Sequence, residues 1–249
     1  KRQTQIEGGK EMNKVIIEDI RKQDFRYAEA IKTLQTNIQF AGKNTKVVMI
    51  TSCFPNEGKS DIALSLAKEM ATSGKRVLLL DADIRKSSFI SRFRIQEKVY
   101  GLSQYLSGQI TPQDLIYMTN YHNMNMIFSG PSAPNPTNLL GDEVFAMMMD
   151  TLRQHYDYIF VDTPPISSVI DAAIIAQRCD GAIMVVESEA VSYRAVQKAL
   201  AQIEKSGCNI LGGVLNKVDA KKNKYYSSYY SKKYGEYYKK SEEYMKNQE

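Results

Sequence analysis

The sequence has few of the residues on which disulfide, zinc or histidine chemistry depends. Its 249 residues include three cysteines and two histidines. Cys53, Cys179 and Cys208 are widely spaced and form no C-x-x-C pair, so the sequence predicts neither a disulfide framework nor a zinc site. His122 and His155 lie far apart in the sequence, which argues against histidine-based catalysis. We therefore expect a protein with reduced thiols, as in the cytosol.

Long apolar runs are also absent. No run approaches the roughly 18–20 residues that a membrane-spanning helix needs, and no signal peptide opens the sequence. The apolar runs at residues 77–80 and 182–186 have the length of strands. Because 43% of the residues are hydrophobic, the chain can build a sizeable core. This composition excludes collagen-like, coiled-coil and wholly disordered proteins.

Short β-branched runs alternate with helical patterns through the middle of the chain, which is typical of a parallel sheet with crossover helices. Apolar residues recur at helical spacing over residues 60–73 and 191–206, and a glycine follows each segment. An amphipathic helix is expected at 24–41. The strands are expected at 46–51, 76–81, 123–128, 157–162, 181–186 and 209–215. We therefore predict one α/β domain over residues 24–220, with a doubly wound, mostly parallel sheet.

The two ends of the chain differ from this domain. Residues 221–249 contain no Val, Ile, Leu, Phe or Trp, but they include eight tyrosines, eight lysines and four glutamates. With so little aliphatic surface to bury, this segment is expected to be a disordered tail. Residues 1–23 are interpreted as an N-terminal extension, in which Met12 is the expected natural start.

The strongest motif is a phosphate-binding loop. Residues 53–60 read C-F-P-N-E-G-K-S, between a predicted strand and a predicted helix. They match the P-loop G-x-x-x-x-G-K-[ST], with Cys53 in place of the first glycine. In such a loop, backbone N–H groups wrap a phosphate at the positive end of a helix. Gly58 would let the backbone approach, Lys59 would reach the β- and γ-phosphates, and Ser60 would bind Mg²⁺. The residues predicted to bind ATP are Pro55, Asn56, Glu57, Gly58, Lys59, Ser60 and Asp61.

Three carboxylates at the ends of predicted strands support this site. Asp81 and Asp83 end one apolar run, and Asp162 ends another as in a Walker B element. The carboxyl ends of parallel strands meet along one edge, where ligands bind. Because three carboxylates would repel one another there, the sequence predicts Mg²⁺ at this edge. A chance G-K-S sequence, and carboxylates that only cap helices, stay open as simpler alternatives.

The order of the motifs resembles the bacterial tyrosine kinases of capsular and exopolysaccharide synthesis, from about residue 24 to the C-terminus. The resemblance rests on residues 29–38 (E-A-I-K-T-L-Q-T-N-I), the P-loop, residues 81–86 (D-A-D-I-R-K, the Walker A′ string), 129–131 with 135–136, 161–165 (V-D-T-P-P), 209–217 (N-I-L-G-G-V-L-N-K) and the terminal tyrosines. A P-loop NTPase-like fold of the MinD-like type with a deviant Walker A motif is implied.

The resemblance implies ATP-dependent autophosphorylation of the tail, with Lys59, Asp81, Asp83 and Asp162 as catalytic residues. In the family pattern Ser60, Asp83 and Asp162 hold Mg²⁺, and Asp81 accepts or orients the proton of the tyrosine hydroxyl. The implied acceptors are Tyr225, Tyr226, Tyr229, Tyr230, Tyr234, Tyr237, Tyr238 and Tyr244. Two further side chains, Arg85 and Lys86, either stabilise the transferring phosphoryl group or are only solvated charges.

The tail has the length and charge for such a role. A flexible segment of 29 residues has an r.m.s. span of about 30 Å, enough to reach an adjoining active site. Its charge of 8 − 4 = +4 would be inverted by phosphorylation of all eight tyrosines, which adds roughly −12 to −16. The alternatives are a solubilising tail and a segment that binds single-stranded nucleic acid, of which we do not expect the second.

The partners are also implied by the resemblance. Without a membrane-spanning segment, the protein resembles the cytoplasmic type that a separate transmembrane co-polymerase activates and recruits to the inner face of the cell membrane. Residues 1–23 are then either an added or an activator-derived segment, and a phosphotyrosine phosphatase is a further partner. Ring-forming members carry E-x-x-R-x-x-R on the leading helix, where this chain has Glu29, Lys32 and Gln35. Because lysine and glutamine lack the planar fork of arginine, self-association through this helix is expected to be weak or different.

Two rival functions fit parts of the sequence. A positioning ATPase of the MinD or ParA type shares the fold, but such proteins carry a lysine early in the P-loop, where this chain has C-F-P. They also have no reason for eight terminal tyrosines. The second rival is a regulatory module that binds nucleotide without kinase activity, and the retained Lys59, Asp81, Asp83 and Asp162 argue against it.

Overall fold

The computed structural model describes residues 13–20, 25–42 and 44–219. The strands are β1 (Asn13–Val15), β2 (Val47–Ser52), β3 (Val77–Asp81), β4 (Tyr117–Thr119), β5 (Met124–Ile127), β6 (Tyr158–Asp162), β7 (Gly181–Glu187) and β8 (Asn209–Asn216). The helices are α1 (Phe25–Phe40), α2 (Lys59–Thr72), α3 (Phe89–Arg92), α4 (Leu102–Leu106), α5 (Pro112–Leu115), α6 (Pro136–Gly141), α7 (Glu143–His155), α8 (Asp171–Ala176) and α9 (Tyr193–Lys205). Within these ranges, no helix is long and apolar enough to cross a membrane.

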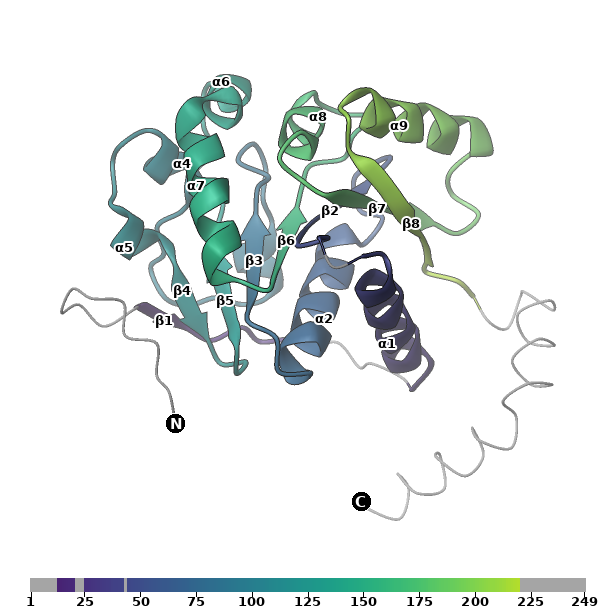
Figure 1. The fold of residues 1–249 in the computed structure, drawn as a ribbon, viewed down its shortest axis with the longest axis horizontal. Helices are drawn as coiled ribbons and strands as arrows, with labels where there is room; N and C mark the ends of the chain where they lie inside the picture. The colour runs from purple at the N-terminus through teal and green to yellow at the C-terminus, as the bar shows by residue number, and fades with distance from the viewer. Residues whose placement is uncertain (1–12, 21–24, 43, 220–249) are drawn as a thin grey trace, which may run out of the picture.

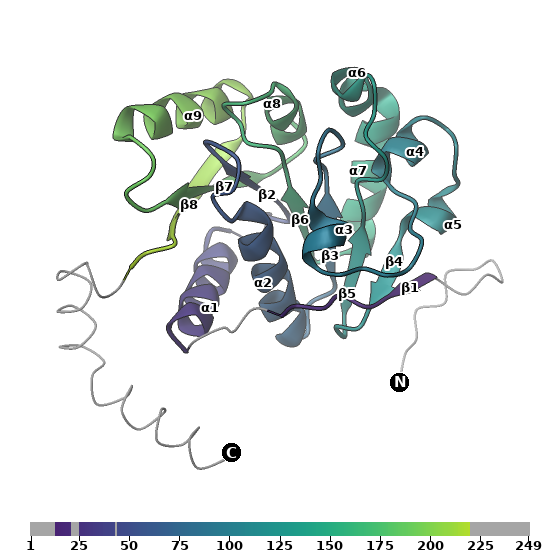
Figure 2. The same cartoon turned by 180° about the vertical axis from the view of Figure 1, so that it is seen from behind.

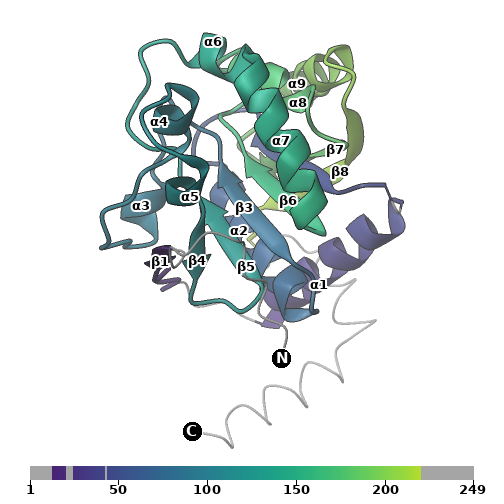
Figure 3. The same ribbon diagram turned by 60° about the vertical axis from the view of Figure 1, so that its left-hand side comes forward.

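The strands form a single sheet in the order β1-β4-β5-β3-β6-β2-β7-β8, with helices on both faces (Figure 1). Strands β5, β3, β6, β2, β7 and β8 run parallel to one another. At one end of the sheet β4 runs antiparallel to β5, and β1 pairs with β4 (Figure 3). The doubly wound, mostly parallel sheet predicted from the sequence is confirmed.

Each central strand is apolar on both sides because helices cover both faces of the sheet. Val48 and Ile50 of β2 pack with α1, α2 and α3 on the face seen in Figure 2. Val47 and Met49 point to the other face, where they pack with helices from α4 to α9. This alternation is the two-residue period of a β-strand, and here both sets of positions are hydrophobic.

The six strands and three helices predicted from the sequence are present, with ends that differ by one or two residues. Strands β1 and β4 were not predicted, because three residues are too few for a clear alternation. Residues 13–20, which the sequence analysis placed in the N-terminal extension, join the sheet through β1 and bury Val15 and Ile17. Asp19 then forms an ion pair of 2.9 Å with Lys68 of α2.

All three cysteine thiols, which lie within the described residues, are free. The predicted disordered tail, with its eight tyrosines, lies outside the described residues.

Candidate functional site

The phosphate-binding loop connects β2 to α2 at the carboxyl edge of the sheet. Asn56 and Gly58 have positive φ angles of 67° and 92°, in the left-handed region that glycine adopts readily. A Cβ atom on Gly58 would lie 2.2 Å from Nδ2 of Asn216, so a side chain here would displace the Asn216 amide from the loop. The loop therefore has the backbone that an anion-binding nest at a helix N-terminus needs.

Strands β3 and β6 bring two carboxylates to the same edge. Asp81 and Asp162 are paired in register at the ends of these strands, and both side chains are buried. The ammonium of Lys59 lies 3.4 Å from Oδ1 of Asp162 and 3.4 Å from the hydroxyl of Ser60. The fold thus places four of the predicted site residues together, from segments about 20 and 80 residues apart.

The charges of this cluster perturb one another. Burial raises the pKa of Asp81 from 3.8 to about 7, and the carboxylate of Asp162 adds to the shift. The hydrogen bond from Ser87 and the charge of Lys59 act in the opposite direction on Asp81. Burial also raises the pKa of Asp162, against the effect of Lys59. Burial lowers the pKa of Lys59, but Asp162, Asp83 and Asp81 outweigh it and raise that pKa, so the lysine is a cation.

The donor atoms fit a hard cation that arrives with a phosphate ligand. Apart from the ion pair with Lys59, Oδ1 of Asp162 is buried and has no hydrogen-bond donor among the described residues. Asp83 is half-buried, and its Oδ1 accepts a 3.0 Å hydrogen bond from the backbone of Lys86. In the part of the chain that the structure describes, no group of three His, Cys, Asp or Glu residues could hold a metal alone. Mg²⁺ is commonly held by one or two carboxylates together with substrate phosphates, which the hydroxyl of Ser60 and these two carboxylates would complement.

Sequence reasoning missed two partners of the site that come from the segment after β3. The hydroxyl of Ser87 donates a 2.5 Å hydrogen bond to Oδ2 of Asp81. Arg92 lies at the end of α3, and its Nη2 is 2.6 Å from Oδ2 of Asp61 in the first turn of α2. Arg92 therefore compensates the extra negative charge of Asp61 beside the loop. No local sequence pattern predicts either contact, because each depends on how the segment after β3 folds in the tertiary structure.

Arg85 forms a structural ion pair. Its Nε and Nη2 atoms lie 2.5 and 3.0 Å from the two carboxylate oxygens of Asp171, which is buried at the start of α8. Nη2 also donates to the hydroxyl of Thr137, 3.0 Å away. This ion pair differs from both roles left open for Arg85, a contact with the transferring phosphoryl group and a solvated charge, since Nε and Nη2 are engaged within the protein.

The loop residues differ in their surroundings. Pro55 and Asn56 are exposed, whereas Glu57 is only 2% exposed. The carboxylate of Glu57 accepts hydrogen bonds from the backbone N–H groups of Phe54, at 2.5 Å, and Glu187, at 3.0 Å. Glu57 therefore shapes the loop with its side chain, and its contribution to a bound nucleotide would be its backbone.

Two residues at the end of β8 also contact the loop, although the sequence analysis gave them no role. Nδ2 of Asn216 donates to the carbonyl oxygen of Glu57 at 2.8 Å, and Nζ of Lys217 donates to the carbonyl oxygen of Asn56 at 2.6 Å. The string N-I-L-G-G-V-L-N-K contained both residues, but nothing in it showed that they reach the loop.

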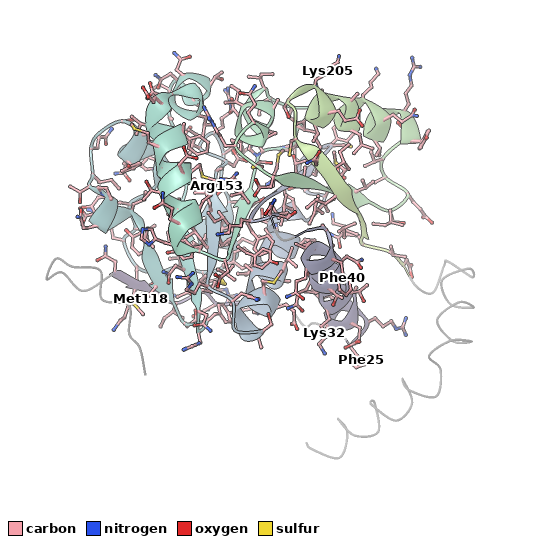
Figure 4. The ribbon with its side chains drawn as sticks, viewed as in Figure 1. Phe25, Lys32, Phe40, Met118, Arg153 and Lys205 are labelled. Atoms are coloured by element: carbon pink, nitrogen blue, oxygen red, sulfur yellow. The ribbon has the colours of Figure 1, made fainter. Side chains whose placement is uncertain are left out.

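The leading helix does not expose the three positions of the ring-forming pattern equally. Lys32 pairs with Glu29 of its own helix at 2.9 Å, and Figure 4 shows Lys32 on α1 between Phe25 and Phe40. Gln35 is 9% exposed and faces α2, where its Nε2 lies 4.0 Å from the sulfur of Met70. The prediction of weak or different self-association through this helix stays a prediction.

Comparisons with known proteins agree with this site. The family described as "ParA: NUBPL iron-transfer P-loop NTPase" matches residues 43–246. The tyrosine-protein kinase CpsD of Streptococcus pneumoniae is 43% identical over 197 residues, which cover 79% of this chain and 87% of that protein. The crystal structure of the chimerical protein CapA2B2 has a TM-score of 0.74 and 32% identity, and covers 83% of this chain and 94% of that one. The kinase domain of the Escherichia coli tyrosine kinase ETK has a TM-score of 0.72 at 29% identity, with 78% of each chain covered.

The rival group also shares the fold. The septum site-determining protein MinD of Pyrococcus horikoshii, solved with Mg-ADP, has a TM-score of 0.59 at 24% identity. At that identity the likeness shows the fold alone. Of the two functions, tyrosine kinase and positioning ATPase, the positioning ATPase is therefore the less supported. The P-loop implies nucleotide binding in either case.

Proposed function

Since the chain belongs to the bacterial tyrosine-protein kinases, within the ParA-type P-loop NTPases, we propose that it transfers the γ-phosphoryl group of ATP to tyrosines of its own C-terminal segment. The observation that carries this proposal is the convergence of Lys59, Asp81 and Asp162 beside a phosphate-binding loop. The acceptor tyrosines begin at Tyr225, nine residues after the end of β8 at that loop.

The first task of the site is to hold the triphosphate. The loop amides and Lys59 would bind the phosphates, while Ser60, Asp83 and Asp162 would hold Mg²⁺ with them. When bound, Mg²⁺ would neutralise charge that develops on the phosphate oxygens. The ammonium of Lys59 lies 3.4 Å from Oδ1 of the buried Asp162, so this carboxylate orients the ammonium. Phosphoryl transfer depends mainly on such positioning and charge neutralisation.

The second task is to accept a proton. The tyrosine oxygen forms a bond to the γ-phosphorus, the bond from that phosphorus to the ADP oxygen breaks, and the phenolic proton passes to the carboxylate of Asp81. Burial raises the pKa of Asp81 to about 7, closer to that of a phenol than the pKa of an ordinary aspartate. A base tuned toward the working pH is the better acceptor in general base catalysis. Oδ2 of Asp81 accepts a 2.5 Å hydrogen bond from Ser87, and Oδ1 accepts a 3.3 Å hydrogen bond from the backbone N–H of Asp83, so both oxygens of the proposed base are held in place.

The biological setting forms part of the proposal. We expect the kinase to regulate capsular or exopolysaccharide synthesis or export, at the cytoplasmic face of the membrane, through a separate transmembrane activator. CapA2B2 supports a link to a second protein, because it is described as a chimera. A phosphotyrosine phosphatase and self-association through the tail complete the proposed set of partners.

The test is the intact mass of the purified protein after incubation with Mg-ATP. The wild type should gain successive phosphates, while Lys59→Met and a chain truncated after Asp219 should gain none. Lys198→Met serves as the matched control, because Lys198 is exposed on α9. Mass gains that survive truncation would move the acceptor sites into the folded domain.

If the wild type gains no mass, the assay would be repeated with a cytosolic activator segment fused to its N-terminus. If that protein hydrolyses ATP and still gains no mass, the kinase proposal is wrong and a positioning ATPase or a regulatory module takes its place.

A further inference from the structure

The end of β8 is attached to the phosphate-binding loop by two hydrogen bonds that span most of the chain. Asn216 donates to the carbonyl oxygen of Glu57 at 2.8 Å across 159 residues, and Lys217 donates to the carbonyl oxygen of Asn56 at 2.6 Å across 161 residues. Both acceptors are main-chain carbonyls of consecutive residues in the loop. The contacts therefore act on the backbone of the loop, whatever its side chains are.

These bonds set the direction of the two peptide planes that follow. In a trans peptide the carbonyl of one residue and the N–H of the next point in opposite directions, and no described peptide bond is cis. A carbonyl of Asn56 held toward β8 turns the N–H of Glu57 away from β8. In the same way, the bond to the carbonyl of Glu57 turns the N–H of Gly58 away. No described residue accepts a hydrogen bond from either N–H group.

The two hydrogen bonds from Asn216 and Lys217 to the loop form a clamp, which is itself supported by residues of β7. Nζ of Lys217 lies 2.8 Å from a carboxylate oxygen of Glu187, so its charge is paired while it holds the loop. Lys217 has a φ of 57°, which few non-glycine residues adopt. The backbone N–H of Glu187 in turn donates to the buried carboxylate of Glu57 at 3.0 Å, and Ser188 donates to the carbonyl oxygen of Asn216 at 2.9 Å. Loop, β7 and β8 thus form one closed network.

We propose that Asn216 and Lys217 are positioning residues of the nucleotide site, which aim the N–H groups of Gly58 and Glu57 at the phosphates of ATP. Their partners are peptide carbonyls, so their action on the nucleotide passes through the loop. This proposal rests on the proposed ATP site but not on the transfer of phosphate to tyrosine. The alternative is that the two residues only fasten β8 to the rest of the domain.

Binding of Mg-ADP separates the two roles. Asn216→Ala and Lys217→Met each remove one bond to the loop, and the methionine keeps most of the lysine stem. Asn209→Ala and Lys205→Met are the matched controls, because Asn209 lies at the opposite end of β8 and Lys205 is exposed at the end of α9. We expect the dissociation constant of Mg-ADP, measured by calorimetry, to rise about tenfold or more in each clamp variant, as for a lost hydrogen bond to a charged group. In the controls it should stay within about twofold.

A second measurement reads the amide directly. In ¹H–¹⁵N spectra of the full chain, the amide signal of Gly58 should move on addition of Mg-ADP in the wild type and in both controls, and should move much less in the clamp variants. Melting of the nucleotide-free protein accompanies each titration. A fastening role alone would lower the melting temperature and leave both the affinity of the folded protein and the Gly58 shift unchanged, which would overturn the proposal.

The remaining outcomes are also decisive. If Asn216→Ala does not fold, Lys217→Met decides by the same two readouts, because this side chain is 45% exposed and its loss leaves no buried gap. The wild type could bind Mg-ADP, lose affinity in the Asn216 and Lys217 variants, and yet transfer no phosphate to tyrosine. That result would contradict the proposed function and support this inference. A wild type that does not bind Mg-ADP at all would overturn both.

Discussion

Burial of the charged form of Asp81 lowers the stability of the folded protein, and substitution of Asp81 by asparagine should remove this cost. The pKa of Asp81 is raised from 3.8 to about 7 by burial and by Asp162. A raised carboxyl pKa means that the folded state holds the proton more tightly than the unfolded state. Between these two pKa values the stability of the nucleotide-free protein therefore falls as pH rises, and the full cost is present above about pH 7.

The size of the effect follows from the same two values. A shift of 7 − 3.8 = 3.2 units corresponds to about 4 kcal/mol at pH 8, at 1.36 kcal/mol per unit. At pH 5 the cost is about 1.7 kcal/mol, because the unfolded chain is ionised there and the folded one is mostly protonated. Asparagine keeps an oxygen to accept the hydrogen bond of Ser87 and carries no charge. Asp81→Asn should therefore be more stable than the wild type, by a margin that grows by about 2–3 kcal/mol from pH 5 to pH 8.

The assay is thermal unfolding of both proteins from pH 5 to pH 8, without nucleotide and with a chelator present. For a chain of this length 1 kcal/mol corresponds to about 2–4 °C, so the difference in Tm should widen by about 5–10 °C over this range. The same variant should gain no phosphate from Mg-ATP, since it lacks the proposed base.

Asp157→Asn is the matched control with the opposite shift. The hydrogen bond and charge of Arg76 hold the pKa of Asp157 below its ordinary value. Its contribution to stability is present above the unfolded pKa and is lost only in stronger acid, so the difference in Tm for Asp157→Asn should be constant between pH 5 and pH 8. A difference for Asp81→Asn that is equally flat, or a variant less stable than the wild type at pH 8, would refute the reasoning.

Three further substitutions test other parts of the structure. Gly58→Ala should raise the dissociation constant of Mg-ADP about tenfold or more, because its Cβ would lie 2.2 Å from Nδ2 of Asn216 and would displace that amide from the loop. Gly74→Ala, with a similar φ of 87° and open space, should cost only about 1 kcal/mol and leave Mg-ADP binding unchanged. Asp171→Ala should lower the free energy of unfolding by about 1.5–3 kcal/mol in urea titrations, because it removes the bidentate hydrogen bonds to Arg85. A change under about 0.5 kcal/mol would contradict the structural role. Asp19→Asn should cost about 1–2 kcal/mol, since this buried carboxylate pairs with a lysine of α2 at 2.9 Å; equal stability would show that residues 13–20 do not support the domain.

Much of the fold could be predicted because its signals are local. Each central strand is a short run of apolar residues, since helices cover both of its sides, and α2 and α9 repeat their apolar residues at helical spacing. Strands β1 and β4 escaped prediction, because three residues at a sheet edge are defined by their partners more than by their own pattern. The P-loop could be located from its spacing, and the positions of Asp81 and Asp162 at one edge follow from the parallel sheet.

The side-chain contacts around the site could not be predicted from the sequence. Arg85 follows the Walker A′ aspartates by two residues and looked available for catalysis, yet it pairs with a buried aspartate 86 residues away. Ser87 had no recognisable motif, and its bond to Asp81 depends on the turn between β3 and α3.

By itself, the sequence determined which chemistry the chain carries: a glycine, a lysine and a serine at fixed spacing, and carboxylates at the ends of apolar strands. These features are set by the local geometry of a strand, a turn and a helix. Only the tertiary structure decided which carbonyls of the loop are held and by what. That choice depends on the end of β8 lying beside a loop about 160 residues earlier in the chain. Hydrogen bonds across such separations depend on the packing of the whole sheet, which no local pattern contains.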